Sequence, residues 1–158
     1  MEKRIRVGFF SFTCCEGCMI QFMECLNKRY DKWMAKMDVV HFRALRKDKG
    51  KMIEDLDIAF VEGAISTKSE KEKLLKIRKK SKKLVAFGSG AVSGYPSDQR
   101  NCFDSKLKKK ISPVVKKLGQ ISKISPLNKF VKVDDEMDGC PVTQKEIIKK
   151  IDGYLKNA

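Results

Sequence analysis

Apolar residues in this chain occur in two patterns, short continuous runs and longer stretches in which they recur every three or four positions. Short runs rich in β-branched and aromatic residues are typical of buried strands, and the longer spacing is typical of helices with one apolar face. Strands are predicted at residues 4–12, 38–45, 56–61, 83–88 and 129–133. Helices are predicted at residues 17–30, 68–82, 104–118 and 142–156.

Two of the predicted helices carry further local signals. The first has four apolar residues at helical spacing, Met19, Ile20, Met23 and Leu26. The last begins after Thr143, and Glu146 follows three positions later. This spacing indicates that Thr143 is the N-cap of a capping box.

The order of these elements predicts the fold class. Repeated strand-helix units favour α/β architecture, and the chain length suits a flavodoxin-like parallel sheet with helices on both faces. The 158 residues are 42% apolar, which is enough to close one core. With no internal repeat and no linker in view, a single domain is predicted over residues 1–158.

The apolar runs are short, which bears on localisation. VGFFSF and DIAFVEGAI fall well below the roughly 20 residues that would span a bilayer, and no apolar signal segment follows Met1. We therefore expect a cytoplasmic protein without a membrane span. Thiols stay reduced in that compartment, so six cysteines and one histidine favour metal or redox chemistry over structural disulfides.

A formal charge of +15 raises nucleic acid as a partner. The lysines, however, fall in stretches such as residues 68–83 and 106–118, where apolar residues recur at helical spacing between them. That arrangement indicates solvated helix faces or an acidic protein partner. Because no aromatic stacking pattern, zinc-finger spacing or helix-turn-helix signature accompanies the charge, no nucleic-acid partner is expected.

Five of the cysteines follow predicted strands. Cys14, Cys15 and Cys18 follow the first strand, Cys102 follows the fourth, and Cys140 follows the last short one. The carboxyl ends of parallel strands meet at one edge of a sheet, where such folds bind their ligands. A thiolate quartet drawn from separate loops is what a 4Fe-4S cluster needs.

Other interpretations of the cysteine loop remain open at this point. A C-x-x-C pair between a strand and a helix also describes a thioredoxin-like dithiol, and four thiolates can hold structural zinc. The SFTCCEG turn also lies where flavodoxin-like folds bind the phosphate of flavin mononucleotide. Cys25 lies within the first predicted helix and is interpreted as a buried structural thiol. His41 is interpreted as a core residue of a strand.

Four stretches taken in order resemble a known family. They are SFTCCEGCMIQF, DIAFVEGAIST, VAFGSGAVSGYPSDQRN and DGCPV. Together they resemble the small subunit of nickel-iron hydrogenases and are similar to the related 20 kDa subunit of NADH:quinone oxidoreductases. The resemblance implies a flavodoxin-like domain without flavin that holds one 4Fe-4S cluster. It also implies that the nickel-iron centre belongs to a large subunit, since this chain lacks the paired C-x-x-C motifs that carry nickel.

The resemblance can be carried over residue by residue. Cys15 and Cys18 match the opening C-x-x-C pair of the family, and Cys140 matches the cysteine of its GCP motif. The family's remaining ligand is a cysteine at the position where this chain has Gly90. We therefore predict Cys15, Cys18, Cys102 and Cys140 as cluster ligands, with Cys14 as the alternative to Cys102.

The function that the resemblance implies is electron transfer in a cytoplasmic nickel-iron hydrogenase. The chain is expected to relay electrons between the large subunit and a further iron-sulfur or flavin subunit. Glu16 and Glu62 are predicted at the same sheet edge, where they would face the partner or assist proton movement. Two alternatives remain: a subunit of a related non-hydrogenase oxidoreductase, and a basic zinc- or thiol-binding module.

Overall fold

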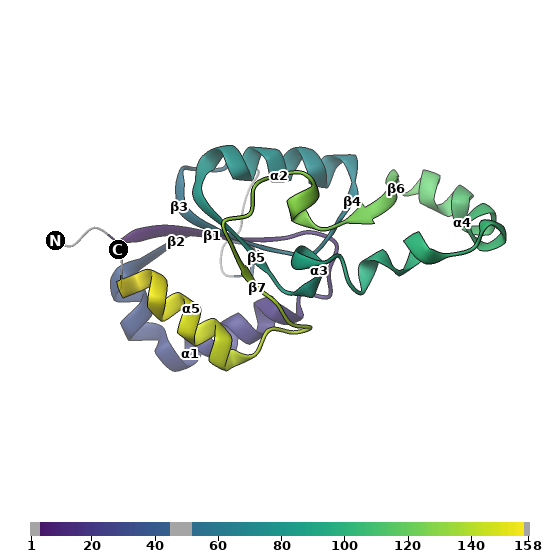
Figure 1. Cartoon of the computed structure of the whole chain (residues 1–158). Helices are drawn as coiled ribbons and strands as arrows, with labels where there is room; N and C mark the ends of the chain where they lie inside the picture. Colours follow the sequence, from purple (N-terminus) through teal and green to yellow (C-terminus); the bar gives the residue numbers. More distant parts are fainter. Residues whose placement is uncertain (1–3, 45–51, 157–158) are drawn as a thin grey trace.

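The computed structural model describes residues 4–44 and 52–156 and has a five-stranded parallel sheet at its centre (Figure 1). Its strands are β1 (Ile5–Ser11), β2 (Met37–Phe42), β3 (Leu56–Glu62), β5 (Ser81–Phe87) and β7 (Asp135–Met137). They lie in the order β2-β1-β3-β5-β7, which is the strand order of flavodoxin-like folds. The predicted fold class is confirmed.

Helices cover both faces of this sheet. α1 (Gly17–Lys36) and α5 (Gln144–Lys156) lie against one face, and α2 (Lys68–Lys80) lies against the other (Figure 1). At the start of α5, the hydroxyl of Thr143 accepts a hydrogen bond from the backbone N–H of Glu146 at 3.3 Å. Within the two described ranges, no helix combines the length and the apolar character needed to cross a bilayer.

Side chains of β1 alternate between two apolar cores, one on each face of the sheet. Phe9 lies in the core beneath α1 and α5, with its ring centroid 4.1 Å from that of Phe22 and 4.8 Å from that of Phe60. Phe10 lies in the opposite core, which also contains Leu74 of α2. Because successive strand residues point to opposite faces, burial of both rings holds the sheet between its helices.

α1 extends six residues beyond its predicted end and buries only part of the predicted apolar set. Met19 and Leu26 are buried, whereas the side chains of Ile20 and Met23 are 58% and 38% exposed. The remaining buried residues of the helix are Cys18, Phe22, Cys25 and Trp33. The two exposed apolar residues lie in the part of α1 that follows the cysteine loop.

Cys25 and His41, which the sequence indicated to be structural residues, both pack within the fold. Cys25 is fully buried in α1, and its thiol donates to the carbonyl of Gln144 with a sulfur-oxygen distance of 3.8 Å. His41 is half-buried on β2, and its ring stacks on that of Phe10 at a centroid distance of 4.2 Å. Cys25 therefore joins α1 to α5, and His41 packs against the core on the α2 side.

The strand predicted at residues 129–133 is wrong. A short 3-10 helix, η2 (Leu127–Lys129), occupies its start, and the fifth sheet strand is β7, further along the chain. Phe130, Val131 and Val133 are half-buried side chains of a loop that packs on the α2-side core. Apolar residues that anchor a loop give the same short run as a strand, so the pattern does not separate the two.

A second, two-stranded sheet has no counterpart in the sequence prediction. It pairs β4 (Ile65–Thr67) with β6 (Gln120–Ser125) in antiparallel orientation. β4 has three residues and β6 is mostly polar, so neither gives a recognisable strand pattern.

Residues 97–125 form a projection that we call the arm. It contains η1 (Ser97–Cys102), α4 (Ser105–Lys117) and β6, and it follows the short helix α3 (Ser89–Val92) (Figure 1). α4 matches its prediction within one residue at each end. Asp104 caps it by accepting a hydrogen bond from the N–H of Leu107 at 2.7 Å. No side chain of α4 is buried, so this helix is not part of either core.

Candidate functional site

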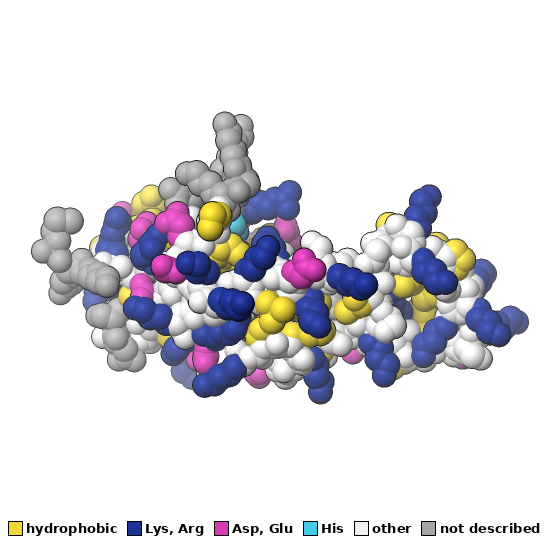
Figure 2. Space-filling model, turned by 90° about the horizontal axis from the view of Figure 1, so that it is seen from above, with side chains coloured by type: hydrophobic (Ala, Val, Ile, Leu, Met, Phe, Trp, Pro, Cys, Tyr) yellow, Lys and Arg dark blue, Asp and Glu magenta, His cyan; other side chains and the backbone are white. Residues whose placement is uncertain are grey.

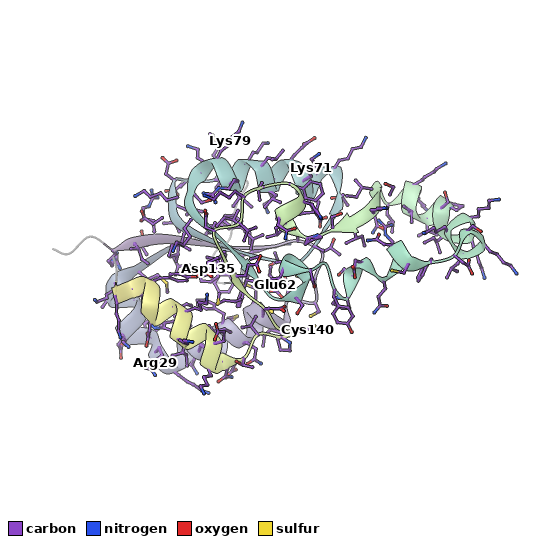
Figure 3. All side chains as sticks on the ribbon, in the orientation of Figure 1. Arg29, Glu62, Lys71, Lys79, Asp135 and Cys140 are labelled. Carbon is purple, nitrogen blue, oxygen red and sulfur yellow. The ribbon has the colours of Figure 1, made fainter. Side chains whose placement is uncertain are left out.

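The loops that follow β1, β5 and β7 meet the end of β3 around a cavity of about 280 Å³. It lies at the carboxyl ends of the parallel strands, where α/β folds bind ligands. Cys14, Cys15, Cys18 and Cys140 all line it. Figure 3 shows Cys140 and Glu62 at this end of the sheet. The predicted convergence of cysteine loops at one sheet edge is therefore observed for four of the five cysteines.

The fifth cysteine is placed differently. Cys102 is exposed at the C-terminal end of η1 and does not line the cavity. Cys14 is half-buried, Cys18 is 4% exposed, and Cys15 and Cys140 are exposed. The structure thus brings together three of the four predicted ligands with the alternative residue Cys14.

Backbone pairing past the ends of the strands shapes the cysteine loop. The N–H of Phe12 donates to the carbonyl of Glu62, and Thr13 and Ala64 exchange two backbone hydrogen bonds at 3.0 and 3.1 Å. The chain then turns at Glu16, whose φ of 59° is left-handed, and enters α1. Cys14 and Cys15 therefore lie in the turn, while Cys18 lies in the first turn of the helix.

Glu62 anchors that first turn from the end of β3. Its two carboxylate oxygens accept hydrogen bonds from the backbone N–H groups of Cys18 and Met19, each at 3.1 Å. Glu16, the N-cap of α1, is exposed and makes no side-chain capping bond. Glu62 therefore accepts the hydrogen bonds that the side chain of an N-cap residue accepts in other helices. Burial raises the pKa of Glu62, which is only 3% exposed.

The two less exposed thiols are poor acids in the metal-free protein. Burial, with the nearby charge of Glu62, raises the pKa of Cys14 and of Cys18 to about 12. Both are therefore protonated at neutral pH, and a metal centre bound there must displace their protons.

The opposite wall of the cavity joins the GSGA and DGCP segments. The N–H of Gly88 donates to Met137 O at 2.8 Å, and the N–H of Ser89 donates to Gly139 O at 2.9 Å. The hydroxyl of Ser89 also donates to the carboxylate of Asp138 at 2.6 Å. These bonds fix the loop that carries Cys140 against the end of β5.

Two glycines set how closely this wall approaches the thiols. A Cβ on Gly88, whose φ is +87°, would lie 2.6 Å from the sulfur of Cys18. A Cβ on Gly90 would lie 3.2 Å from the Cα of Gly63. Gly90, the position where the resemblance predicts the family's remaining ligand, also lines the cavity.

The donor chemistry of the cavity fits an iron-sulfur cluster, whose irons each take one thiolate. Four thiols surround one cavity, and glycine backbone rather than side chains faces Cys18 from the opposite wall. Among the described residues, no group of three or more His, Cys, Asp or Glu side chains is arranged to hold a single metal ion.

The sequence pattern predicts Glu62 at this edge but misses its role as a helix cap. It also misses Tyr95 and Ser97, which line the cavity rim. Tyr95 is 55% exposed. An acidic residue that ends a buried strand is the signal that could have identified Glu62, because a buried carboxylate requires donors.

Comparison with known proteins identifies curated relatives. The chain is 26% identical to the delta subunit of sulfhydrogenase 2 from Pyrococcus furiosus, over 92% of this chain and 60% of that protein. It is also 26% identical to one subunit of the F420-non-reducing hydrogenase vhu from Methanocaldococcus jannaschii, over 96% of this chain and 56% of that protein. The chain thus spans less than two thirds of either relative. The delta subunit of the NAD-reducing hydrogenase HoxS from Cupriavidus necator is likewise 26% identical, over 98% of this chain and 80% of that protein.

A solved structure and a family model also match this chain. A chain of an NAD+-reducing [NiFe]-hydrogenase in the H2-reduced state superposes with a TM-score of 0.84 at 24% identity, covering 98% of this chain and 93% of that one. The model of the NADH ubiquinone oxidoreductase 20 Kd subunit family matches residues 15–154. The resemblance inferred from the four motifs is thereby confirmed, and the chain belongs to the NADH ubiquinone oxidoreductase 20 Kd subunit family.

Proposed function

We propose that this chain is the electron-transfer small subunit of a nickel-iron hydrogenase and that it holds one 4Fe-4S cluster in the cavity at the ends of the strands. The observation that carries the proposal is the convergence of four cysteines on that cavity. The curated relatives described above, which are hydrogenase subunits, support the same assignment.

We further propose that Cys14, Cys15, Cys18 and Cys140 are the ligands. The sequence favoured Cys102 over Cys14, but Cys14 lines the cavity and Cys102 does not. Gly90 offers no sulfur, so a thiol from the cysteine loop takes the place of the family's ligand. Cys102 remains the alternative that mutation must test.

The protein's own groups have distinct tasks in this proposal. A bound 4Fe-4S cluster supplies reversible one-electron storage. Glu62 holds Cys18 by its backbone, and Ser89 and Asp138 fix the loop of Cys140. The formal charge of +15 over the whole chain favours a cluster that gains negative charge on reduction.

Two partners follow from this role. Electrons must arrive from a catalytic site, which we place on a large subunit that carries the nickel-iron centre. They must leave to a second redox subunit with an iron-sulfur or flavin group. All six cysteines are free thiols, which suits an enzyme of the reducing cytoplasm.

The test is anaerobic purification of the chain together with the subunit that copurifies with it. About four iron and four sulfide ions per chain are expected, with an electron paramagnetic resonance signal after reduction and H2-dependent dye reduction. Zinc in place of iron, or no metal, contradicts the proposal and favours the basic zinc- or thiol-binding module.

Variants assign the ligands in the same preparation. Cys14→Ser should lower the iron content and change the resonance signal, whereas Cys102→Ser and the buried control Cys25→Ser should leave both unchanged. Loss of iron in Cys102→Ser with retention in Cys14→Ser would restore the set predicted from sequence.

The family itself favours one second candidate, a subunit of a related oxidoreductase whose large partner lacks nickel. The cluster and its ligands would be the same in both cases. Nickel content and the sequence of the copurifying chain separate them, since a hydrogenase large subunit must provide the nickel-binding cysteines.

A further inference from the structure

α4 has an apolar stripe that the described part of the chain covers only in part. The stripe consists of Leu107, Ile111 and Val114 of α4 and its C-cap residue Leu118, which recur at intervals of four, three and four residues and therefore share one face. Leu107, Val114 and Leu118 are 38%, 58% and 61% exposed, and Ile111 is half-buried. An amphipathic helix normally buries such a stripe in the core of its domain, so the exposure of this stripe requires a reason.

The charge of α4 is one-sided. The helix contains no acidic residue and six exposed lysines, Lys106, Lys108, Lys109, Lys110, Lys116 and Lys117. Figure 2 shows lysine and arginine side chains around apolar surface along the arm. None of these six forms an ion pair within residues 4–44 and 52–156, whereas Lys32 and Lys82 on the body each pair with an aspartate. The mutual repulsion of the arm lysines would be relieved by an acidic surface.

Hydrogen bonds between η1 and β6 order the arm internally. Arg100 donates to the side chain of Gln120 at 2.7 Å, and the side chain of Asn101 both donates to Ile124 O and accepts from Ile124 N. β6 pairs in turn with β4, which lies outside the arm, and this pairing joins the arm to the body. The stripe is therefore presented by an ordered base, which lowers the entropic cost of binding a partner.

The arm begins at the rim of the cysteine cavity. Tyr95 and Ser97 line that cavity, and the hydroxyl of Ser97 donates to the carbonyl of Thr13 at 3.5 Å. η1 and α4 follow directly. A protein that covers the cavity and contacts the exposed ring of Tyr95 therefore approaches the start of the arm as well.

We infer that the arm is a docking surface for the subunit that covers the cysteine cavity, and that this subunit presents an acidic surface with an apolar groove for Leu107, Val114 and Leu118. The inference rests on the proposed function, because it requires a partner over the cavity. An anionic membrane also attracts basic amphipathic helices with Trp, Phe or Leu on the apolar face; α4 has Leu107 but no Trp or Phe, and membrane binding is an outcome of the test that would overturn the inference.

The test compares arm variants with matched body variants in the complex with the copurifying subunit. Val114→Asp places a charge on the stripe, and its control is Leu75→Asp on α2, at an apolar residue that is 38% exposed. Exchange of the variant against excess wild-type chain should be about tenfold faster for Val114→Asp and unchanged for Leu75→Asp. Equal exchange rates for the two variants would overturn the inference.

Charge reversal tests the acidic partner separately. Lys109→Glu with Lys110→Glu should weaken binding by about tenfold at low salt and much less at high salt, while Lys76→Glu with Lys79→Glu on α2 changes the net charge equally and should have little effect. Because α4 buries no side chain, the arm variants are expected to keep wild-type circular dichroism and iron content.

Two further readouts separate the outcomes. A photo-crosslinker at position 114 should attach to the same subunit as one at position 95, next to acidic residues. Vesicles of phosphatidylcholine with phosphatidylserine should bind the wild-type and Val114→Asp complexes equally; selective loss in the variant would assign the arm to a membrane and overturn the inference. A wild-type chain without iron refutes the proposed function. An iron-loaded complex whose binding is insensitive to the arm variants refutes only the docking role of the arm.

Discussion

The carboxylate of Glu62, at the end of β3, accepts both of its backbone hydrogen bonds from the first turn of α1, at the N–H groups of Cys18 and Met19. Both distances are 3.1 Å, and the carboxylate is almost completely buried. One side chain therefore ties the central strand of the sheet to the helix that carries a proposed ligand. The position of Cys18 depends on a residue 44 positions away.

Replacing Glu62 should destabilise both the fold and the cluster site. Glu62→Ala leaves two buried N–H groups without acceptors, which costs roughly 1–3 kcal/mol of the free energy of unfolding for each such group. Glu62→Gln keeps one acceptor and should lose less. Urea titration of the metal-free chain measures the loss, and iron content after reconstitution should fall in the same order. The matched control is Glu16→Gln, since Glu16 makes no capping bond; an equal loss there would contradict the role given to Glu62.

A second carboxylate links α1 to α5 and should make stability depend on pH. Burial alone would raise the pKa of Asp152, but hydrogen bonds from Lys32 and Trp33, with the charges of Lys32 and Arg29, hold it below its usual range. The folded protein therefore binds this proton less readily than the unfolded chain. The stabilisation is present above the unfolded value of about 3.9 and is lost as pH falls through that value towards the folded pKa.

Asp152→Asn tests this dependence. At pH 7 the variant should lose about 1–3 kcal/mol of the free energy of unfolding, because the hydrogen bonds to a charged acceptor become neutral ones. Below about pH 4 the difference from wild type should shrink, because the unfolded wild-type chain then binds a proton at Asp152 that the folded protein binds only at lower pH. Urea unfolding between pH 3 and pH 7 measures both effects, and a difference that does not change with pH would contradict the assignment.

Most of the fold could be predicted because its main signals are local. Four of the five sheet strands and all four long helices lie close to their predicted positions, and Thr143 caps α5 as its spacing indicates. The strand predictions that failed concern segments in which buried residues do not recur at a regular spacing. Phe130 and Val131 anchor a loop rather than a strand, and the short edge strand β7 has only Met137 fully buried. Such a segment acquires its strand geometry from pairing with β5, which its own sequence does not encode.

The sequence predicts which edge of the sheet carries the site. It does not predict which side chains line the cavity there. Strand order brings the loops of Cys15, Cys18 and Cys140 to one place, and that much follows from the fold class. The choice between Cys14 and Cys102 depends on the path of η1, which is held away by Arg100 and Asn101 bonding to β6. The sheet that contains β6 was itself not predicted, so no spacing argument could place Cys102. Its role as a ligand stays a prediction.

The close approach of Gly88 to Cys18 gives a test of the cavity shape. Gly88→Ala places a Cβ 2.6 Å from the sulfur of Cys18, at a φ of 87° and a ψ of 160°, a backbone region that is essentially limited to glycine and costs about 1–3 kcal/mol for other residues. Gly119→Ala also places an L side chain at a positive φ, of +63°, but its Cβ meets nothing within 4 Å. Both variants should lose stability in urea, and only Gly88→Ala should lose iron. Equal iron contents would mean that the Cys18 sulfur does not face this wall in the loaded protein.

Gly90 allows the family's ligand position to be restored. Gly90 lines the cavity with the four cysteines, and a Cβ there would lie 3.2 Å from the Cα of Gly63, a tight contact that a small backbone shift relieves. If Cys14 is the fourth ligand, Cys14→Ser should lose iron and the second substitution Gly90→Cys should recover most of it, because a new thiol enters the same cavity. Iron analysis and the low-temperature resonance spectrum measure both steps.

The control is the neighbouring substitution Ser93→Cys in the same Cys14→Ser background. Ser93 is exposed one turn further along and does not line the cavity, so its thiol should not restore the cluster. Recovery with Gly90→Cys alone would show that position 90 reaches the irons and that a thiol of the cysteine loop normally replaces it. Failure of Gly90→Cys, with intact folding by circular dichroism, would mean that the contact with Gly63 does not relax. Recovery of the iron content with Gly90→Cys and also with Ser93→Cys would mean that any thiol added nearby suffices. That result would contradict the assignment of Cys14 as a ligand.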